Sequence, residues 1–387
     1  MKEFRQEVRD WLEENCPPSM RTPMPENERV WGGRRAEFIN PDSKVWLDRM
    51  VEKGWTVPTW PTKYGGGGLD REQAKILDEE MLRLKCRAPL ASFGIWMLGP
   101  VLLELGTEAQ RLEYLPPIAR GEIRWCQGYS EPGAGSDLAG LQTRAEDRGD
   151  YYLVNGQKVW TSYANHADWI FCLVRTDTTL KHSGISFLLF DMESPGVETR
   201  PIKLISGASV FCETFFTDVE VPKGNLIGEV NGGWQIAKAL LGHERKAISQ
   251  MGVRGTGRLP STLELARHYL DQAEGKIENS PLRNAMSSLL MDDEAFAYTS
   301  QRTSGSKNAA ALSSMLKYYG TEQNKRKFEL LLKCAGSDAL GWEGEQFSKH
   351  DLELCRQWLR SKGNSIEGGT SEIQLNVIAK RVLGLPD

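Results

Sequence analysis

The stretch at residues 150–160, DYYLVNGQKVW, decides the fold class of the middle of this chain. Aromatic and β-branched residues flank Asn155-Gly156, a dipeptide that strongly favours a two-residue turn between antiparallel strands. Further runs of strand length follow, separated by Gly, Pro or polar breaks: WIFCLVRT (169–176), ISFLLFDM (185–192), GVETRPI (196–202) and ETFFTDVEV (213–221). The pattern predicts a hairpin at 150–160 within a β domain of barrel or sandwich type.

Helical patterns lie on both sides of this β region. Before it, residues 4–15 and 42–53 carry apolar residues on one helical face, and Asp70 is placed to cap a third helix. After it, helical period returns at 233–255, 259–275, 280–302 and 313–334, and a further helix starts near Thr370. We therefore predict a multidomain α+β chain: an N-terminal helical domain (1–120), a middle β domain (121–230) and a C-terminal four-helix bundle (231–387).

Length and composition exclude several classes of protein. With 387 residues, 40% hydrophobic and 26% charged, and a formal net charge of −4, the chain is globular and unlike a polybasic nucleic-acid binder. It has no apolar run near the roughly 18 residues that span a membrane, and its charged start does not resemble a signal peptide. Seven singly spaced cysteines and five histidines without metal-ligand spacing indicate reduced thiols, a cytoplasmic location and no metal site.

The loop 130–137, SEPGAGSD, is the most concentrated motif of the chain. Its glycines, among them Gly135, can expose backbone N–H groups, and Ser130 and Ser136 add hydroxyl groups. Such a loop can hold a phosphate or a polar heterocycle. The simpler interpretation is a turn that only connects two domains.

A second motif, Val159-Trp160-Thr161-Ser162, ends a predicted strand. Trp160 could stack near a planar cofactor while the hydroxyl groups of Thr161 and Ser162 bond to its edge. A core tryptophan followed by a capping serine is the structural alternative.

Two motifs in the C-terminal part carry candidate acid–base and hydrogen-bonding groups. Glu244, followed by Arg245, lies in an apolar helical stretch. Burial there would disfavour the charged carboxylate and raise its pKa toward neutrality, which suits a general base. The alternative is a solvated or ion-paired side chain. In the stretch 366–374, IEGGTSEIQ, the freed amides of a helix start could bind a carbonyl oxygen, or Thr370 could simply cap the helix.

Taken in order, these motifs resemble the acyl-CoA dehydrogenase flavoprotein family over essentially the whole chain. The resemblance rests on WCQGYSEPGAGSDLAG (125–140), NGQKVWTSYANHADW (155–169), FTDVEVPKGNLIGE (216–229) and IEGGTSEIQLNVIAKRVLGLP (366–386). The family fold consists of an N-terminal helical domain, a middle β domain and a C-terminal four-helix bundle. The family fold therefore implies the same three domains as the hydrophobic pattern of the sequence.

The resemblance implies FAD-dependent α,β-dehydrogenation of an acyl-CoA thioester. In the family a carboxylate removes the α-proton, and the β-hydrogen leaves as hydride to the flavin. By position, the cofactor contacts fall on Tyr129, Ser130, Gly135, Ser136, Trp160, Thr161, Ser162, Thr370 and Glu372. The same comparison implies substrate contacts from Ser136 and Arg245, and polarisation of the thioester carbonyl by the backbone N–H of Gly368.

The family places its catalytic base at either of two positions. At the commoner position, directly before the Gly-Thr pair, this chain has Gly368, and Glu367 lies one residue too early. One residue turns a side chain by about 100° on a helix. At the other position, used by members that resemble branched-chain and steroid-side-chain enzymes, this chain has Glu244. We predict Glu244 as the base, with Glu367 as the alternative.

Two departures from the family bear on assembly. The stretch LDQAEGKIENSP (270–281) lacks the Arg and Phe that reach a neighbouring subunit's FAD, and CAGSDALGWEGE (334–345) replaces a glycine-rich loop. This pattern resembles subunits of heterotetrameric members in which a paralogous subunit completes the FAD site. A homotetramer with altered adenine contacts is the alternative.

The same scaffold leaves three functions open. The first is a dehydrogenase that passes electrons to an electron-transfer flavoprotein, with a branched or bulky acyl chain as substrate. The second is a flavin oxidase or monooxygenase. The third is a noncatalytic partner subunit, because fold alone does not fix function.

Overall fold

The computed structural model describes residues 1–242, 259–303 and 309–386. The chain divides into two compact units. The first contains residues 1–202 and 210–240, and the second contains residues 203–209 and 241–387. The division into domains 1–120, 121–230 and 231–387 stays a prediction, since the N-terminal helices and the sheet belong to one compact unit.

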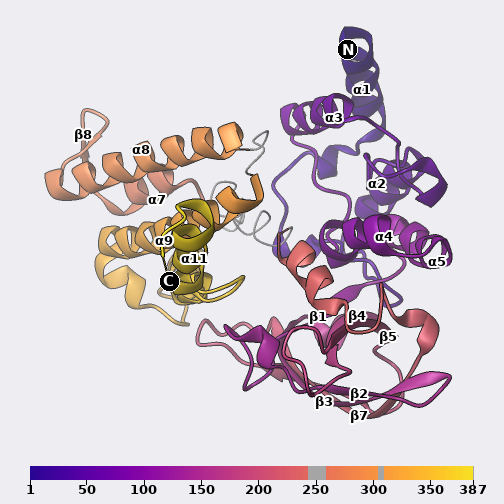
Figure 1. The fold of residues 1–387 in the computed structure, drawn as a ribbon. Helices are drawn as coiled ribbons and strands as arrows, with labels where there is room; N and C mark the ends of the chain where they lie inside the picture. Colours follow the sequence, from indigo (N-terminus) through magenta and orange to yellow (C-terminus); the bar gives the residue numbers. More distant parts are fainter. Residues whose placement is uncertain (243–258, 304–308, 387) are drawn as a thin grey trace. The chain divides into compact units, whose positions relative to one another are not determined.

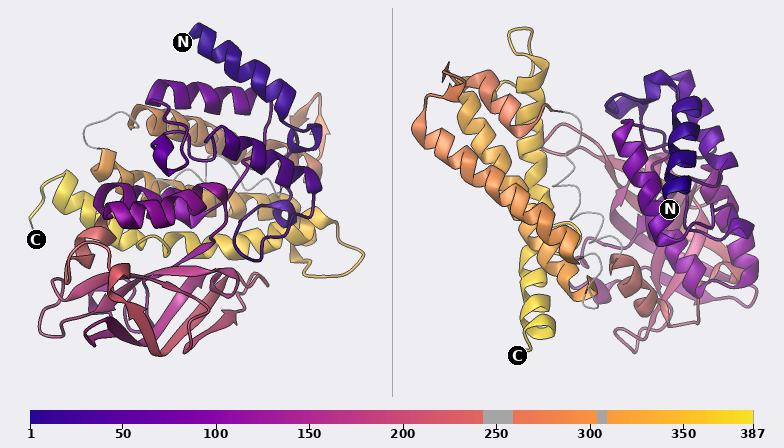
Figure 2. Two further views of the ribbon diagram at one scale, coloured as in Figure 1. Left: turned by 90° about the vertical axis from the view of Figure 1, so that its right-hand side faces the viewer. Right: turned by 90° about the horizontal axis from the view of Figure 1, so that it is seen from above.

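The N-terminal helices of the first unit lie on one side of its sheet (Figures 1 and 2). They are α1 (Lys2–Asn15), α2 (Pro41–Glu52), α3 (Arg71–Arg83), α4 (Gly99–Leu105) and α5 (Glu108–Arg120). Asp70 caps α3 as predicted, because its carboxylate accepts bonds from the amides of Glu72 and Gln73. The apolar faces of these helices share a core that includes Val8, Leu12, Trp46 and Leu77.

Helix α5 attaches the helical part to the sheet. The side-chain amide of Gln110 donates to the carbonyl oxygens of Gly224 and Leu226, both at 2.8 Å. The ring of Tyr114 packs edge-on against Trp125 with 5.8 Å between ring centroids. Helices and sheet of this unit are therefore joined by both polar and aromatic contacts.

The sheet of the first unit has seven strands among the described residues. They are β1 (Trp125–Gly128), β2 (Arg144–Asp147), β3 (Tyr151–Ser162), β4 (Trp169–Arg175), β5 (Ile185–Asp191), β6 (Val197–Ile202) and β7 (Phe211–Pro222). Their order is β1-β4-β2-β3-β7-β6, and β5 pairs with β4. Strand β1 runs parallel to β4, whereas β3, β7 and β6 pair in antiparallel fashion.

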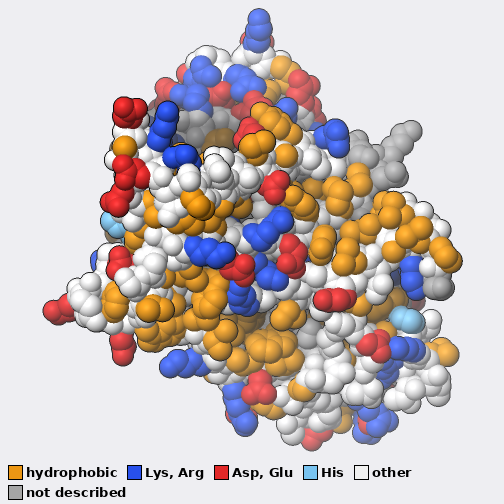
Figure 3. Space-filling view, turned by 90° about the vertical axis from the view of Figure 1, so that its left-hand side faces the viewer, with side chains coloured by type: hydrophobic (Ala, Val, Ile, Leu, Met, Phe, Trp, Pro, Cys, Tyr) orange, Lys and Arg blue, Asp and Glu red, His pale blue; other side chains and the backbone are white. Residues whose placement is uncertain are grey.

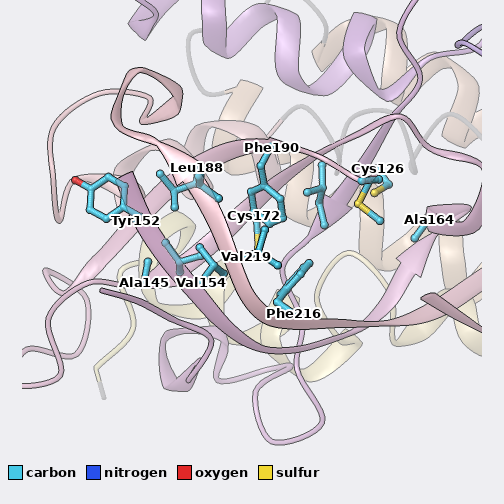
Figure 4. Packing of buried hydrophobic residues seen from close by; sticks show 14 of the residues in the cluster. Cys126, Ala145, Tyr152, Val154, Ala164, Cys172, Leu188, Phe190, Phe216 and Val219 are labelled. Carbon is cyan, nitrogen blue, oxygen red and sulfur yellow. The ribbon is translucent and has the colours of Figure 1, made fainter. Parts of the chain in front are cut away.

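Burial along the strands follows from what covers each face. Strand β7 begins with strict alternation of buried and partly exposed residues, as expected when only one face meets a core. Strands β4 and β5 are buried almost continuously, which matches their unbroken apolar sequences. Figure 4 shows Cys172 of β4 and Leu188 of β5 pointing into a core shared with Phe216 and Val219 of β7.

The hairpin predicted at Asn155-Gly156 is wrong. β3 runs through this dipeptide as one continuous strand, and the chain reverses instead near 148–150. The pairing register with β7 shifts at the dipeptide, which marks a β-bulge. Asn155 exchanges two hydrogen bonds of 2.9 Å with Asp218, and a Cβ at Gly156 would lie 2.7 Å from Thr143 Cα. The glycine therefore permits close approach to Thr143 rather than a turn.

The described part of the second unit is mainly helical. It contains α7 (Thr262–Tyr269), β8 (Gln272–Ala273), β9 (Lys276–Ile277), α8 (Ser280–Thr303), α9 (Ala309–Ala335), α10 (Lys349–Ser361) and α11 (Ser371–Val377). Helix α9 contacts α7, α8, α10 and α11, and is the centre of this arrangement. Its core includes Leu265, Met286, Leu331 and Leu354.

Two predicted features of this unit need correction. The helix expected at 259–275 ends at Tyr269, and the chain turns into the short β8–β9 hairpin around Gly275, whose φ is +75°. The predicted helices also omitted α10, whose start is marked by a capping box between Ser348 and Asp351. The many charged residues of α10 obscured its buried face, which includes Leu354.

Candidate active site

The Gly-rich loop 130–137 follows β1, and the buried carboxylate of Glu131 anchors its base. Glu131 Oε2 accepts the amide N–H of Gln142 at 2.6 Å, and Oε1 accepts that of Thr143 at 2.8 Å. Lys158 Nζ on β3 donates to Glu131 Oε1 at 2.8 Å. The loop is thereby tied to residues 142–143 and to β3.

Lys158 and Glu131 form an ion pair that is almost fully buried. The Lys158 side chain is 0% exposed and that of Glu131 is 7% exposed. Burial opposes ionisation of Glu131, but the Lys158 ammonium and the hydrogen bonds from Thr143 and Gln142 outweigh it and hold the pKa of this carboxyl below its ordinary value. Lys158 also donates to the Tyr129 carbonyl oxygen at 3.1 Å. The carboxylate of Glu131 is therefore stabilised in its ionised form, and its contacts fix the start of the loop.

Beyond this anchor the loop is open. A Cβ added at Gly133 or Gly135 would have no atom within 4 Å. Within the described part of the chain, the amides of Gly133, Gly135 and Ser136 donate to no acceptor. A cavity of about 420 Å³ adjoins the loop and is lined by Glu131, Pro132, Gly133, Gly140, Gln142, Thr143, Gly156 and Gln157. Free amides beside open space suit an anionic or polar ligand.

Trp160 is turned outward by a second β-bulge. Lys158 pairs with Thr214 and Thr161 pairs with Cys212, so β3 holds one more residue than β7 across this interval. Trp160 has a φ of +61°, which is unfavourable for a side chain of its size, and its side chain is 53% exposed. Strain and exposure together favour a functional interpretation over a core tryptophan.

The two motifs of the first unit meet in space. The amide of Val159 donates to the Ser130 carbonyl oxygen at 2.9 Å, which brings the Gly-rich loop beside the strand segment that carries Trp160. Tyr129 differs from Trp160, because its ring is 5% exposed and packs edge-on against Phe171 and Phe187. Its side chain therefore belongs largely to the core.

A second cluster surrounds the start of α11. Thr370 caps this helix by accepting the amide of Ile373 at 3.2 Å, as predicted. The amides of the helix start and the Thr370 side chain lower the pKa of Glu372. A cavity of about 400 Å³ is lined here by Tyr318, Glu322, Lys325, Ser365, Ile366, Thr370, Ser371, Glu372 and Leu375. Thr370 and Glu372 thus share one cavity wall.

Glu367 is held by two side chains. Its Oε2 accepts from Arg360 Nη2 at 2.7 Å, and its Oε1 accepts from Asn364 Nδ2 at 2.6 Å. The carboxylate is only partly buried, with 28% of the side chain exposed. Both oxygens of this carboxylate are therefore already engaged by neighbouring side chains.

Glu244 and Arg245 lie outside the described residues, so the structure does not place the predicted base or its neighbour. The remaining predicted residues fall in two groups. Tyr129, Ser130, Gly135, Ser136, Trp160, Thr161 and Ser162 belong to the first unit, and Glu367, Gly368, Thr370 and Glu372 belong to the second.

The first group fits a planar cofactor with polar edges. The exposed Trp160 ring offers a stacking surface, and the Thr161 hydroxyl is buried without a partner among the described residues. The open amides of Gly133 and Gly135 suit an anionic or polar edge. A planar ligand with polar or anionic edges, such as a flavin nucleotide, is compatible with these groups.

Comparisons with known proteins agree with this fit. Family models match residues 1–122 (acyl-CoA dehydrogenase, N-terminal domain), 126–219 (middle domain) and 231–383 (C-terminal domain). Among curated relatives, the acyl-CoA dehydrogenase IpdE1 of Mycolicibacterium smegmatis is 34% identical over 399 residues, covering 100% of this chain and 98% of the relative. The chain belongs to the acyl-CoA dehydrogenase family, an oxidoreductase family that is generally flavin-dependent.

Solved structures show the same fold over the full length. The structure titled Tcur3481-Tcur3483 steroid ACAD has a TM-score of 0.76 and 29% identity, with coverage of 100% of this chain and 97% of the other. The ChsE4-ChsE5 complex from Mycobacterium tuberculosis has a TM-score of 0.75 and 28% identity, with the same coverage. The predicted order of helical, β and helical parts is therefore confirmed. No helix of the described residues combines the length and apolarity needed to cross a bilayer.

Two lysines hold the site together without being conspicuous in the sequence. Lys158 lies four residues after Val154 on β3, so both side chains fall on the buried face of the strand, and this even spacing is a local signal of burial. Lys317, which is 0% exposed in α9, gave no comparable signal. Its partners are carbonyl groups far along the chain.

Proposed function

We propose that this protein binds FAD and oxidises the Cα–Cβ bond of a branched or ring-bearing acyl-CoA thioester, with an electron-transfer flavoprotein as electron acceptor. Membership of the family supports the reaction class. When bound, the flavin would accept the β-hydrogen as hydride and pass the electron pair onward. The protein's own groups bind the thioester, polarise its carbonyl and remove the α-proton.

The observation that carries our choice of base is the pairing of Glu367 with Arg360 and Asn364. Because both carboxylate oxygens are engaged, proton uptake by Glu367 would sacrifice an ion pair and a hydrogen bond. Gly368 has no side chain to replace it. We therefore propose that Glu244 removes the α-proton.

The remaining roles follow from the two clusters. We propose that Trp160 stacks near the isoalloxazine and that the Ser130, Thr161 and Ser162 segment lies along its edge. The loop amides at Gly135 and the hydroxyl of Ser136 would meet phosphate or the CoA chain. Further contacts are proposed for Tyr129 (flavin edge), Thr370 and Glu372 (FAD), Arg245 (substrate), and the Gly368 N–H (thioester carbonyl).

We propose a bulky acyl chain as substrate. A glycine at position 368, where the commoner family pattern has its base, leaves more room near the α-carbon than a glutamate would. The similarity to the Tcur3481-Tcur3483 steroid ACAD supports this substrate class. The acyl specificity is tested by comparing kcat/KM for straight, branched and steroidal acyl-CoA thioesters. Clear preference for the straight chains would refute it.

We further propose assembly with a paralogous subunit. Residues 270–281, which include the β8–β9 hairpin, lack the Arg and Phe that usually reach a neighbouring subunit's FAD in the family. Residues 334–345, which include a 3₁₀ turn and the loop after it, replace the family's glycine-rich loop. Hydrophobic side chains are exposed on the face seen in Figure 3. On α8, Met291 (73% exposed) and Tyr298 (61% exposed) are seven residues apart and share one helix face. FAD bound per chain after expression alone tests this: full occupancy in a homo-oligomer would reject the partner.

The experiment that tests the base compares Glu244→Gln with Glu367→Gln. We expect Glu244→Gln to abolish turnover with bound flavin retained, and Glu367→Gln to retain turnover. Measuring flavin absorbance per chain in both variants separates loss of chemistry from loss of cofactor. The assignment is wrong if Glu367→Gln alone abolishes turnover.

A further inference from the structure

Lys317 is a lysine buried in the middle of α9, with 0% of its surface exposed. Its Nζ donates to the carbonyl oxygen of Asn364 at 3.1 Å and to that of Gly369 at 2.7 Å. These carbonyls stand at the two ends of the loop 364–369. A buried ammonium is costly unless its hydrogen bonds are well made, so its placement against two main-chain carbonyls calls for an explanation.

The loop held by Lys317 has an unusual backbone. Gly368 has a φ of +64° and Gly369 a φ of +91°, which side-chain-bearing residues rarely adopt. The side-chain amide of Gln374, 1% exposed, donates to the Gly368 carbonyl at 3.0 Å and to the Gly369 carbonyl at 3.4 Å. Both carbonyls therefore face buried donors. A Cβ on Gly369 would lie 2.5 Å from Gln374 Nε2.

Helix α9 fixes the loop at further points. Asn324 Nδ2 donates to Asn364 Oδ1 at 2.8 Å, and Glu322 accepts the Ser371 hydroxyl at 2.7 Å. These two bonds hold the side chain of Asn364 in the loop and that of Ser371 directly after it. Lys317 differs from them because it binds the main chain on both sides of Gly368.

We propose that Lys317, assisted by Gln374, is a positioning residue for the dehydrogenation reaction. The Gly368 N–H belongs to the peptide unit between Glu367 and Gly368, and the peptide units on both sides of it are held. The Glu367 N–H donates to the Gly363 carbonyl at 3.0 Å, and the Gly368 carbonyl accepts from Gln374, while Lys317 holds the next carbonyl, that of Gly369. With both neighbouring units held, the unit that carries the Gly368 N–H has little freedom to rotate. Among the described residues, no acceptor takes the Gly368 N–H. This inference rests on the proposed function, in which that N–H stabilises the thioester oxygen as the α-proton leaves.

The energetic reason is preorganisation. When the α C–H bond breaks, its electron pair delocalises onto the thioester oxygen, while the proton goes to the base. A donor already aimed at that oxygen avoids reorganisation during the step. Charge-assisted bonds from Lys317 are about twice as strong as neutral ones, so they suit a backbone that must not relax.

The test uses Lys317→Met in the flavin-loaded protein, in complex with its partner if one co-purifies. Lys333→Met is the matched control, since Lys333 is an exposed lysine of the same helix. We expect Lys317→Met to reduce kcat about 10- to 100-fold and to leave KM within about 3-fold, because the lost interaction acts in the transition state. Lys333→Met should match wild type.

Two readouts do not depend on flavin reduction. The first is deuterium uptake at the α-carbon of 3,3-dimethylbutyryl-CoA, which has α-hydrogens but no β-hydrogen and so cannot be dehydrogenated. We expect Lys317→Met to slow this exchange about 10- to 100-fold. The second is amide hydrogen exchange of a peptide covering 362–372, which should become faster in Lys317→Met only.

The outcomes distinguish failure of the proposed function from failure of the positioning role of Lys317. If wild type neither exchanges the α-hydrogens nor oxidises any acyl-CoA, the proposed function fails and this inference fails with it. If wild type is active and Lys317→Met equals Lys333→Met in both exchange measurements, Lys317 is not a positioning residue. Should Lys317→Met fail to fold, Gln374→Met carries the test, with the same expected slowing of α-carbon exchange; an unchanged rate there overturns the proposal.

Discussion

The buried pair of Lys158 and Glu131 allows a quantitative prediction. Lys158→Met removes the ammonium but keeps a side chain of similar length, so a carboxylate with 7% exposure would remain with only the amides of Gln142 and Thr143 as donors. Breaking a buried pair in this way costs about 3–5 kcal/mol. The free energy of unfolding at pH 7.5 should fall by that amount.

The pH dependence gives this prediction a specific sign. In wild type the folded-state pKa of Glu131 is lowered, so its contribution is fully present above the unfolded pKa of about 4.3 and is lost only at lower pH. In Lys158→Met, burial without the ammonium raises the folded pKa, and folding then takes up a proton. Acidification from about pH 7.5 to about pH 5.5 should therefore narrow the stability gap between variant and wild type.

The assay is urea unfolding followed by tryptophan fluorescence at both pH values. Lys181→Met is the control, because Lys181 pairs with Asp137 at 2.9 Å but the two side chains are 57% and 67% exposed. An exposed pair contributes about 0–1 kcal/mol. A loss below about 1 kcal/mol in Lys158→Met, or a gap that does not narrow on acidification, would refute the reasoning.

Three further predictions concern other parts of the chain. Hydrogen bonds from Arg9, Arg83 and Arg5 outweigh burial and lower the pKa of Glu80 to about 2. Because solvent screens these partly exposed arginines, we expect Glu80→Gln to lower the free energy of unfolding, measured in urea at pH 7, by about 2 kcal/mol. In wild type the stabilisation from the ionised Glu80 is fully present above about pH 4.3 and is lost as the pH falls through about 2. Trp160→Gly should relieve a left-handed backbone that costs about 1–2 kcal/mol, so the melting temperature of the flavin-free protein should hold or rise, while the flavin bound per chain should fall. Ser348→Ala should cost about 1 kcal/mol by removing the cap of α10, and an unchanged melting temperature would contradict this.

Local signals predicted most of the secondary structure. Asp70 and Thr370 cap helices where the sequence placed them, because capping needs only residues within one turn. The continuous apolar runs at 169–176 and 185–192 became β4 and β5 for the same reason. Asn155-Gly156 failed as a turn signal because Asp218 and Thr143, distant in sequence, hold it inside a strand.

The candidate site was predicted only in part. Motif order indicated the Gly-rich loop and Trp160, and the structure shows why Trp160 is exposed: a bulge against β7 turns it outward. The proton acceptor remains a proposal, since Glu244 lies outside the described residues. Pairing of Glu367 with Arg360 depends on a loop conformation that periodicity does not encode.

The sequence by itself determined the order of helical, β and helical parts and the family to which the chain belongs, because period, capping and motif spacing are properties of neighbouring residues. Only the tertiary structure decided which charged side chains are buried and which groups they bind. Lys158 reaches Glu131 across 27 residues, and Lys317 reaches Gly369 across 52. A buried lysine is stable only where the fold supplies oxygen atoms around it, and no local pattern specifies which distant oxygens those are.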